Sequence, residues 1–161
     1  MTGGRLLAAL CRGLAILGGI VLVAASAVTG VSVLGRYFLD RPIPGDGEVA
    51  GLALAVAISL SMPWCAWQRG HVVVDVATGG LPPGGRAALD RAGTLLLAAA
   101  AALLAWRMGV GGVEMRAFGD ESMVLRLPTW IGFAVAVPCF ALTAVAALAA
   151  PGGAAGRDPG P

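Results

Sequence analysis

The sequence predicts an all-α integral membrane protein with four transmembrane helices, short loops and a disordered C-terminal tail. Of its 161 residues, 58% are hydrophobic and only 12% are charged, and the mean hydropathy is +0.85, which is too apolar for a soluble domain of this size. Four apolar segments are long enough for an α-helix to cross roughly 30 Å of hydrocarbon. We place these spans at about 14–35, 49–67, 89–110 and 128–150, within a single domain of residues 1–150.

The first span follows Arg5 and Arg12 and runs without a charge from Gly13 to Gly35. A cleaved signal peptide is the alternative, because residues 25–27 (Ala-Ser-Ala) resemble a cleavage site. The apolar run continues to Leu34, however, which is longer than the core of a signal peptide needs to be. We therefore expect the segment to be retained as a membrane helix.

The second span contains no charge between Glu48 and Arg69, and Trp64 and Trp67 stand near its end. Indole rings favour the membrane interface, because they are apolar in body but carry an N–H group. We therefore expect this helix to meet water near Trp67. A short loop rich in Pro and Gly, residues 36–48, precedes the span.

The third span is the least regular of the four. Its uncharged core, residues 92–106, is only 15 residues long. The flanking Arg91 and Arg107 can extend their charged ends toward water, which would allow so short a core to span the membrane. Residues 108–113 could extend this helix, and residues 107–126 carry several charges and are expected to form a second polar loop.

The fourth span opens with Leu127-Pro128-Thr129-Trp130, where Pro suits the first turn of a helix and Trp suits the membrane interface. It runs uncharged to Ala150. Residues 151–161 are rich in Gly, Ala and Pro, which predicts a disordered tail. Five aromatic residues are expected interfacial anchors: Tyr37, Trp64, Trp67, Trp106 and Trp130.

Four spans place both termini on the same side of the membrane. That side carries six Arg residues and the opposite side carries five, so the preference of positive charge for the cytoplasm barely decides the orientation. The two loops opposite the termini hold six of the nine acids. On that basis we expect both termini to be cytoplasmic.

The composition also limits the chemistry. Ionisable groups at membrane depth mark pumps and transporters, and none lies in the four uncharged cores, so we do not expect the chain to carry a solute by itself. A single His, three Cys without paired spacing and no catalytic triad or phosphate loop predict no enzyme activity, no cofactor and no metal site. A formal charge of +2 without a basic face argues against nucleic acid. Such a chain is most simply a subunit of a membrane complex.

Seven polar residues near the membrane surface are candidate partner-binding residues: Arg36, Glu48, His71, Asp75, Glu114, Asp120 and Glu121. His71 and Asp75 are four residues apart and share a face, so they either clamp one another or stand solvated at the interface. Arg36 and Glu48 lie at facing ends of the first loop and either pair or act as simple anchors, since exposed ion pairs contribute little. The acids of the second loop either meet a partner or are only solvated.

Five different short motifs lie near the ends of the spans: Leu34-Gly35-Arg36-Tyr37, Glu48, Gly70-His71-Val72-x-Val74-Asp75, Leu81-Pro82 and Leu127-Pro128-x-Trp130. Their order and spacing, over roughly residues 14–150, resemble the small membrane subunit (DctQ-like) of tripartite ATP-independent periplasmic (TRAP) transporters. The resemblance implies a four-helix, multi-pass subunit of the bacterial inner membrane with cytoplasmic termini.

The resemblance also implies partners. A large multi-span membrane subunit would hold the substrate and sodium sites, and a periplasmic solute-binding protein would deliver the solute, often an organic acid. The small subunit would brace the large one and help to dock the binding protein, with membrane lipid around both. From the residues alone, a scaffold in an unrelated membrane complex and a small four-helix exporter stay open as alternatives.

Overall fold

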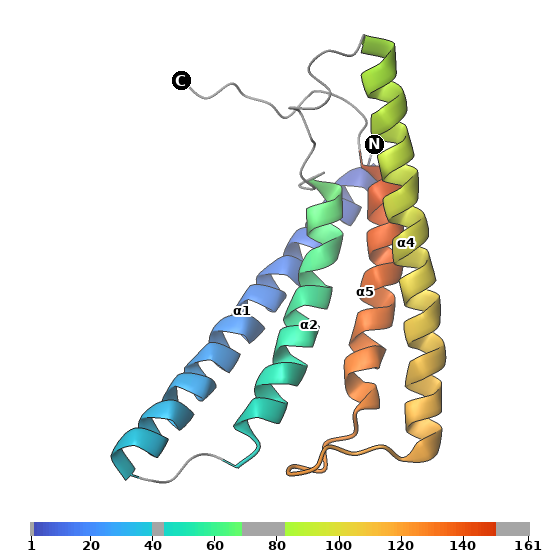
Figure 1. The fold of residues 1–161 in the computed structure, drawn as a ribbon. Helices are drawn as coiled ribbons and strands as arrows, with labels where there is room; N and C mark the ends of the chain where they lie inside the picture. The colour runs from blue at the N-terminus through green and yellow to red at the C-terminus, as the bar shows by residue number, and fades with distance from the viewer. Residues whose placement is uncertain (1, 40–43, 69–82, 151–161) are drawn as a thin grey trace, which may run out of the picture.

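The computed structural model describes residues 2–39, 44–68 and 83–150, which form four long helices (Figure 1). These are α1 (Thr2–Leu39), α2 (Asp46–Trp67), α4 (Pro83–Phe118) and α5 (Trp130–Ala149). Each is long and apolar enough to cross a membrane. The predicted all-α membrane class with four spans is thus confirmed.

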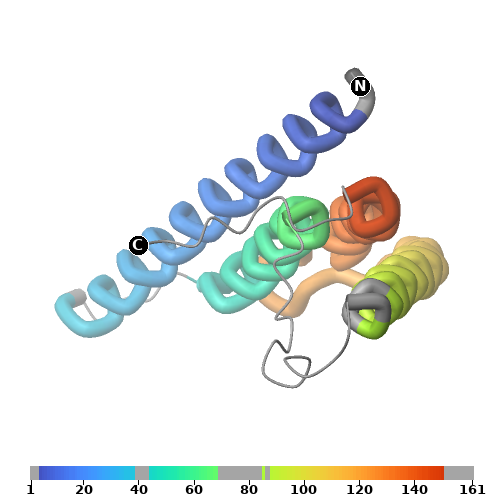
Figure 2. Tube along the Cα trace, turned by 90° about the horizontal axis from the view of Figure 1, so that it is seen from above, coloured from blue at the N-terminus to red at the C-terminus, as the bar shows by residue number. Residues whose placement is uncertain are grey.

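The helices run alternately up and down and form a row in the order α1, α2, α5, α4. Helix α1 packs on α2, α2 packs on α5, and α5 packs on α4, so the last helix in the chain lies between the second and the third (Figures 1 and 2). The terminal end of the row comprises the start of α1, the end of α2, the start of α4 and the end of α5. The loop end is the opposite one, with residues 44–45 and 119–129.

Small buried side chains bring all four helices together at the terminal end. Cys11 of α1 and Ala146 of α5 are fully buried, and they cluster with Ala66 of α2 and Ala98 of α4. Such small residues let helix backbones approach closely. Larger side chains cover this cluster: Leu7, Trp64, Trp67, Leu97 and Leu142. From this cluster toward the loop end, the α1–α2 pair diverges from the α4–α5 pair (Figure 1).

Two glycines mark the closest helix contacts. A Cβ atom at Gly18 of α1 would lie 2.8 Å from the Ala57 carbonyl oxygen and 2.9 Å from the Ser61 Oγ of α2. A Cβ at Gly112 of α4 would lie 2.9 Å from the Cβ of Phe133 in α5. Both helix pairs therefore depend on the absence of a side chain at these positions.

Helix α4 differs from the expectation that a polar loop begins at Arg107, because the helix continues to Phe118. Residues 107–118 include Gly109, Gly111 and Gly112, which disfavour a helix by themselves. Gly109 and Gly112 lie against Val137 and Phe133 of α5, however, so packing between the two helices favours the helical form. The helix ends at Gly119, whose φ of 63° lies in the left-handed region. There the Asp120 N–H donates to the Met115 carbonyl and the Gly119 N–H to the Arg116 carbonyl, which is a Schellman termination. The loop proper is therefore only residues 119–129.

Hydroxyl groups inside the helices mostly bond to their own backbone, as expected for polar groups in an apolar environment. Six of them donate to the carbonyl four residues earlier: Ser26, Thr29, Ser59, Ser61, Thr94 and Thr143. Ser32 is different, because its hydroxyl donates to a carboxylate on the neighbouring helix.

Candidate functional site

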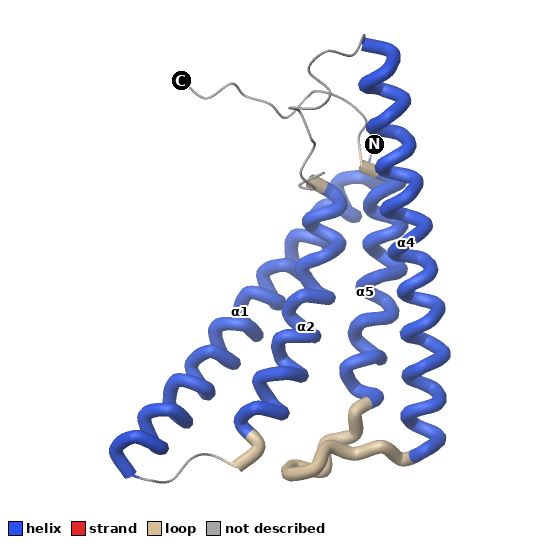
Figure 3. Tube along the Cα trace, in the orientation of Figure 1, coloured by secondary structure: helices blue, strands red, loops and turns tan. Residues whose placement is uncertain are grey.

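The loop between α4 and α5 closes on itself (Figure 3). The Ser122 N–H donates to the Leu127 carbonyl at 2.9 Å, and the Leu127 N–H donates to the Ser122 hydroxyl at 3.2 Å. At the base of the loop, the Thr129 hydroxyl lies within hydrogen-bond distance of the Asp120 carbonyl, at 3.1 Å, and of its carboxylate, at 3.0 Å. The loop is thus an ordered turn with residues 123–125 at its tip.

Glu48, in the first turn of α2 and ahead of the uncharged segment 49–67, holds the tip of this loop. Its carboxylate accepts hydrogen bonds from the Ser122 hydroxyl at 2.7 Å, the Val124 N–H at 3.0 Å and the Leu125 N–H at 3.1 Å. The bond from Ser122, followed by that from Leu125, lowers the pKa of the Glu48 carboxyl below its usual value, because these donors stabilise the ionised form. A residue 74 positions away in sequence thus binds an ionised Glu48.

An apolar contact accompanies this bond. Gly45 has a φ of 78°, and a Cβ atom there would lie 2.6 Å from the Cγ of Leu125. A side chain at position 45 would therefore be strained by its backbone and would collide with Leu125. The Gly45 carbonyl also accepts the N–H groups of Glu48 and Val49 at 3.1 Å, so the same residue starts α2 and seats the loop.

Asp46, two residues before Glu48 in the same first turn of α2, joins α1 to α2. The buried Ser32 hydroxyl of α1 donates to the Asp46 Oδ2 at 2.6 Å, and the Gly47 N–H donates to Oδ1 at 2.8 Å. The Ser32 bond, then the Gly47 bond, and more weakly the charge of Arg36, lower the pKa of the Asp46 carboxyl. We call the set Ser32, Asp46, Glu48, Ser122 and Leu125 the loop-end junction.

Helices α4 and α5 are also in contact at the loop end. The Arg116 guanidinium of α4 lies 5.2 Å from the ring centroid of Trp130 at the start of α5, a cation–π distance. At the loop end, α1 is thus linked to α2, α2 to the loop between α4 and α5, and α4 to α5.

The structure distributes the predicted site residues unevenly. Arg36 and Glu48 both lie at the loop end, but Glu48 bonds to the second loop, and the acid that feels the charge of Arg36 is Asp46. Asp120 is part of the folded loop, Glu121 pairs through its backbone with Pro128 in an antiparallel bridge, and Glu114 is exposed on α4. His71 and Asp75 lie outside the described residues.

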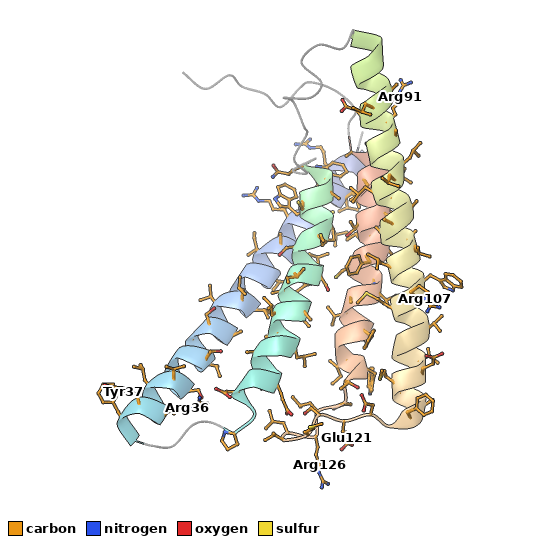
Figure 4. All side chains as sticks on the ribbon, viewed as in Figure 1. Arg36, Tyr37, Arg91, Arg107, Glu121 and Arg126 are labelled. Carbon is orange, nitrogen blue, oxygen red and sulfur yellow. The ribbon has the colours of Figure 1, made fainter. Side chains whose placement is uncertain are left out.

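The predicted anchors also fall into groups. Trp64 and Trp67 pack against the cluster at the terminal end, and Trp130 lies under Arg116. Tyr37 is 82% exposed and points away from the other helices (Figure 4), and Trp106 is 65% exposed. These positions suit contact with lipid.

Sequence reasoning missed Asp46, Ser32 and Ser122. Asp46 has a signal, since an acid in the first turn of a helix is stabilised by the helix dipole. Ser32 and Ser122 are ordinary serines in sequence. The remaining donors, at Val124 and Leu125, are backbone groups that no side chain reveals.

One comparison with known proteins identifies a family. The family model described as "Tripartite ATP-independent periplasmic transporters, DctQ component" matches residues 25–151, which include the loop-end junction and all of α2, α4 and α5. No curated protein and no solved structure matches the chain.

Proposed function

Since this chain belongs to the DctQ family, the small membrane component of tripartite ATP-independent periplasmic transporters, we propose that it is a non-catalytic scaffold in such a transporter. It braces the large membrane subunit and helps to dock a periplasmic solute-binding protein during ion-coupled uptake of an organic acid. It lies in the bacterial inner membrane with both termini cytoplasmic, so that the loop end faces the periplasm.

The observation that carries the docking role is the ordered loop tip. Glu48 bonds to residues 122, 124 and 125, and between them Met123 is 97% exposed. Arg126, beyond the tip, points away from the helices, and Glu121 is exposed on the same loop (Figure 4). A held apolar tip with charges of both signs beside it favours protein binding, because less conformational entropy is lost when the partner docks.

The test is uptake by vesicles that contain the large subunit with or without this chain, supplied with the binding protein. We expect uptake only when all three are present, and no flux from this chain alone under a sodium or proton gradient. Met123→Glu should weaken uptake at limiting binding protein while leaving co-purification with the large subunit intact. Leu6→Glu, which places the same charge at an exposed site of the terminal end, is the matched control.

Transport by the chain alone, or full uptake without it, would overturn the scaffold role. Equal uptake by Met123→Glu and wild type would overturn the docking role of the loop and leave the scaffold role in place.

A further inference from the structure

Arg107 lies at the depth of the middle of α5, rather than at the edge of the membrane. Its neighbour Gly109 faces Val137, since a Cβ atom there would lie 3.9 Å from the Val137 Cγ2. Helix α5 runs from Trp130 to Ala149, so Val137 and the next turn form its centre. The expectation that Arg107 borders the third span is therefore corrected by the continuation of α4 to Phe118.

At this depth in the membrane, the Arg107 side chain is too short to reach water. Arg116 lies level with Trp130, which is expected at the interface, and nine residues of helix between Arg107 and Arg116 correspond to about 13 Å. An extended Arg side chain spans roughly half of that distance. Arg107 is thus close to the centre of a hydrocarbon layer roughly 30 Å thick.

The side chain also points away from its own bundle. Ala101 and Ala105 are buried where α4 packs on α5, and two residues further along a helix corresponds to a rotation of about 200°. Arg107 is exposed and projects from α4 on the side away from α5 (Figure 4). Leu96 and Leu103, at 73% and 56% exposure, share this face.

A charge on an outward apolar face at this depth is costly unless it is paired. Lipid head groups do not reach the centre of the bilayer. A second copy of this chain is also unsuitable, because a two-fold contact through this face would set Arg107 against Arg107. The suitable occupant is a different membrane-spanning protein that brings an anionic oxygen to the same depth.

We propose that the face of α4 formed by Leu96, Leu103 and Arg107 binds the large membrane subunit, which supplies a carboxylate to Arg107 within the membrane. This inference rests on the proposed function and names the surface through which the scaffold acts. The guanidinium suits the role, because its fork of N–H donors matches a carboxylate and it keeps its charge when desolvated.

The experiment measures the affinity of the tagged large subunit for this chain in nanodiscs. Arg107→Leu should raise the apparent dissociation constant at least about 30-fold, as for loss of one partner of a buried charge pair, and Arg107→Lys should lose less. Arg91→Leu, an exposed Arg of α4 near the terminal end, should stay within about twofold of wild type.

The isolated Arg107→Leu chain should unfold at a temperature no lower than wild type, because it loses only an unpaired charge; a lower temperature would overturn the inference. Equal affinity of wild type and Arg107→Leu would overturn this inference alone, and so would an equal loss in Arg91→Leu. Failure of the wild-type chain to bind the large subunit would overturn both the inference and the proposed function.

Discussion

Glu48 shows how one residue can organise a membrane protein outside the membrane. It stands in the first turn of α2, where an acid is stabilised by the helix dipole, and it bonds to a loop 74 positions later in the chain. These two roles agree, because each favours the ionised carboxylate. The sequence indicated that Glu48 was a polar site at a span end, but its partner is set by how α5 docks against α2.

We expect Glu48→Gln to loosen the loop tip. The neutral amide keeps one acceptor oxygen, but its NH2 group cannot accept from the remaining donors. Proteolysis within residues 119–129 should become faster and the midpoint of thermal unfolding in detergent should fall. Ser122→Ala should act in the same direction, because it removes the hydroxyl that donates to Glu48 and accepts from the Leu127 N–H. Glu114→Gln, at an exposed acid of α4, is the control and should match wild type.

The wild-type protein and Glu48→Gln also allow a test of how the contribution of Glu48 to stability depends on pH. The folded-state pKa of Glu48 is lowered, so its contribution is complete above the unfolded value of about 4.3 and disappears as the pH falls through the lower folded value. The gap in unfolding temperature between wild type and Glu48→Gln should therefore be constant from pH 7 to about pH 5 and shrink below. A gap that grows on acidification would contradict the hydrogen bonds described for Glu48.

At the scale of the element, apolar length predicted the four membrane helices, but charge misjudged where α4 ends. Arg107, Glu114 and Arg116 resemble a loop when only polarity is considered. They remain helical despite Gly109, Gly111 and Gly112, because α4 packs on α5 here, with Gly112 against Phe133, and the helix ends only at Gly119. The packing against α5 that outweighs these charges and glycines cannot be derived from the sequence of α4 alone.

Neighbouring glycines of α1 provide a test of the packing between helices. Gly18→Ala inserts a methyl group 2.8 Å from a backbone oxygen of α2, whereas a Cβ at Gly19 has nothing within 4 Å. Overpacking of this kind costs about 1–3 kcal/mol, while Ala is favoured over Gly in an open helix position by about 1 kcal/mol. Gly18→Ala should thus destabilise the protein and Gly19→Ala should not, as measured by unfolding in mixed micelles. Equal effects would contradict the close contact of α1 with α2.

At the scale of the whole molecule, successive membrane spans joined by short loops must alternate in direction, and the structure agrees. The order α1, α2, α5, α4 could not be derived, because it depends on which small residues face each other, such as Cys11, Ala66 and Ala146 in the cluster at the terminal end. Small residues are spread over every span in the sequence. Their pairing is a property of the packed row and not of any one helix.

The orientation of that row is open to a direct measurement. Reporter enzymes that are active only in the periplasm should be active when fused after Gly45 or Gly119 and inactive after Gly84 or Gly153, because cytoplasmic termini place the loop end outside. Activity in the reverse pattern would invert the proposed orientation. It would also remove the loop tip from the side on which a periplasmic protein could reach it.

The length of α4 creates a mismatch with the bilayer. Its 36 residues extend about 54 Å, and tilting alone would have to exceed 50° to hide them in roughly 30 Å of hydrocarbon, beyond the range of about 0–40° seen for membrane helices. We expect Arg116 and Trp130, which are in contact, to lie at the membrane surface, so the surplus emerges at the other side, where α4 rises past the ends of α2 and α5 (Figure 1). We therefore expect about 20 Å at the start of α4 to extend into the aqueous phase on the side of the termini.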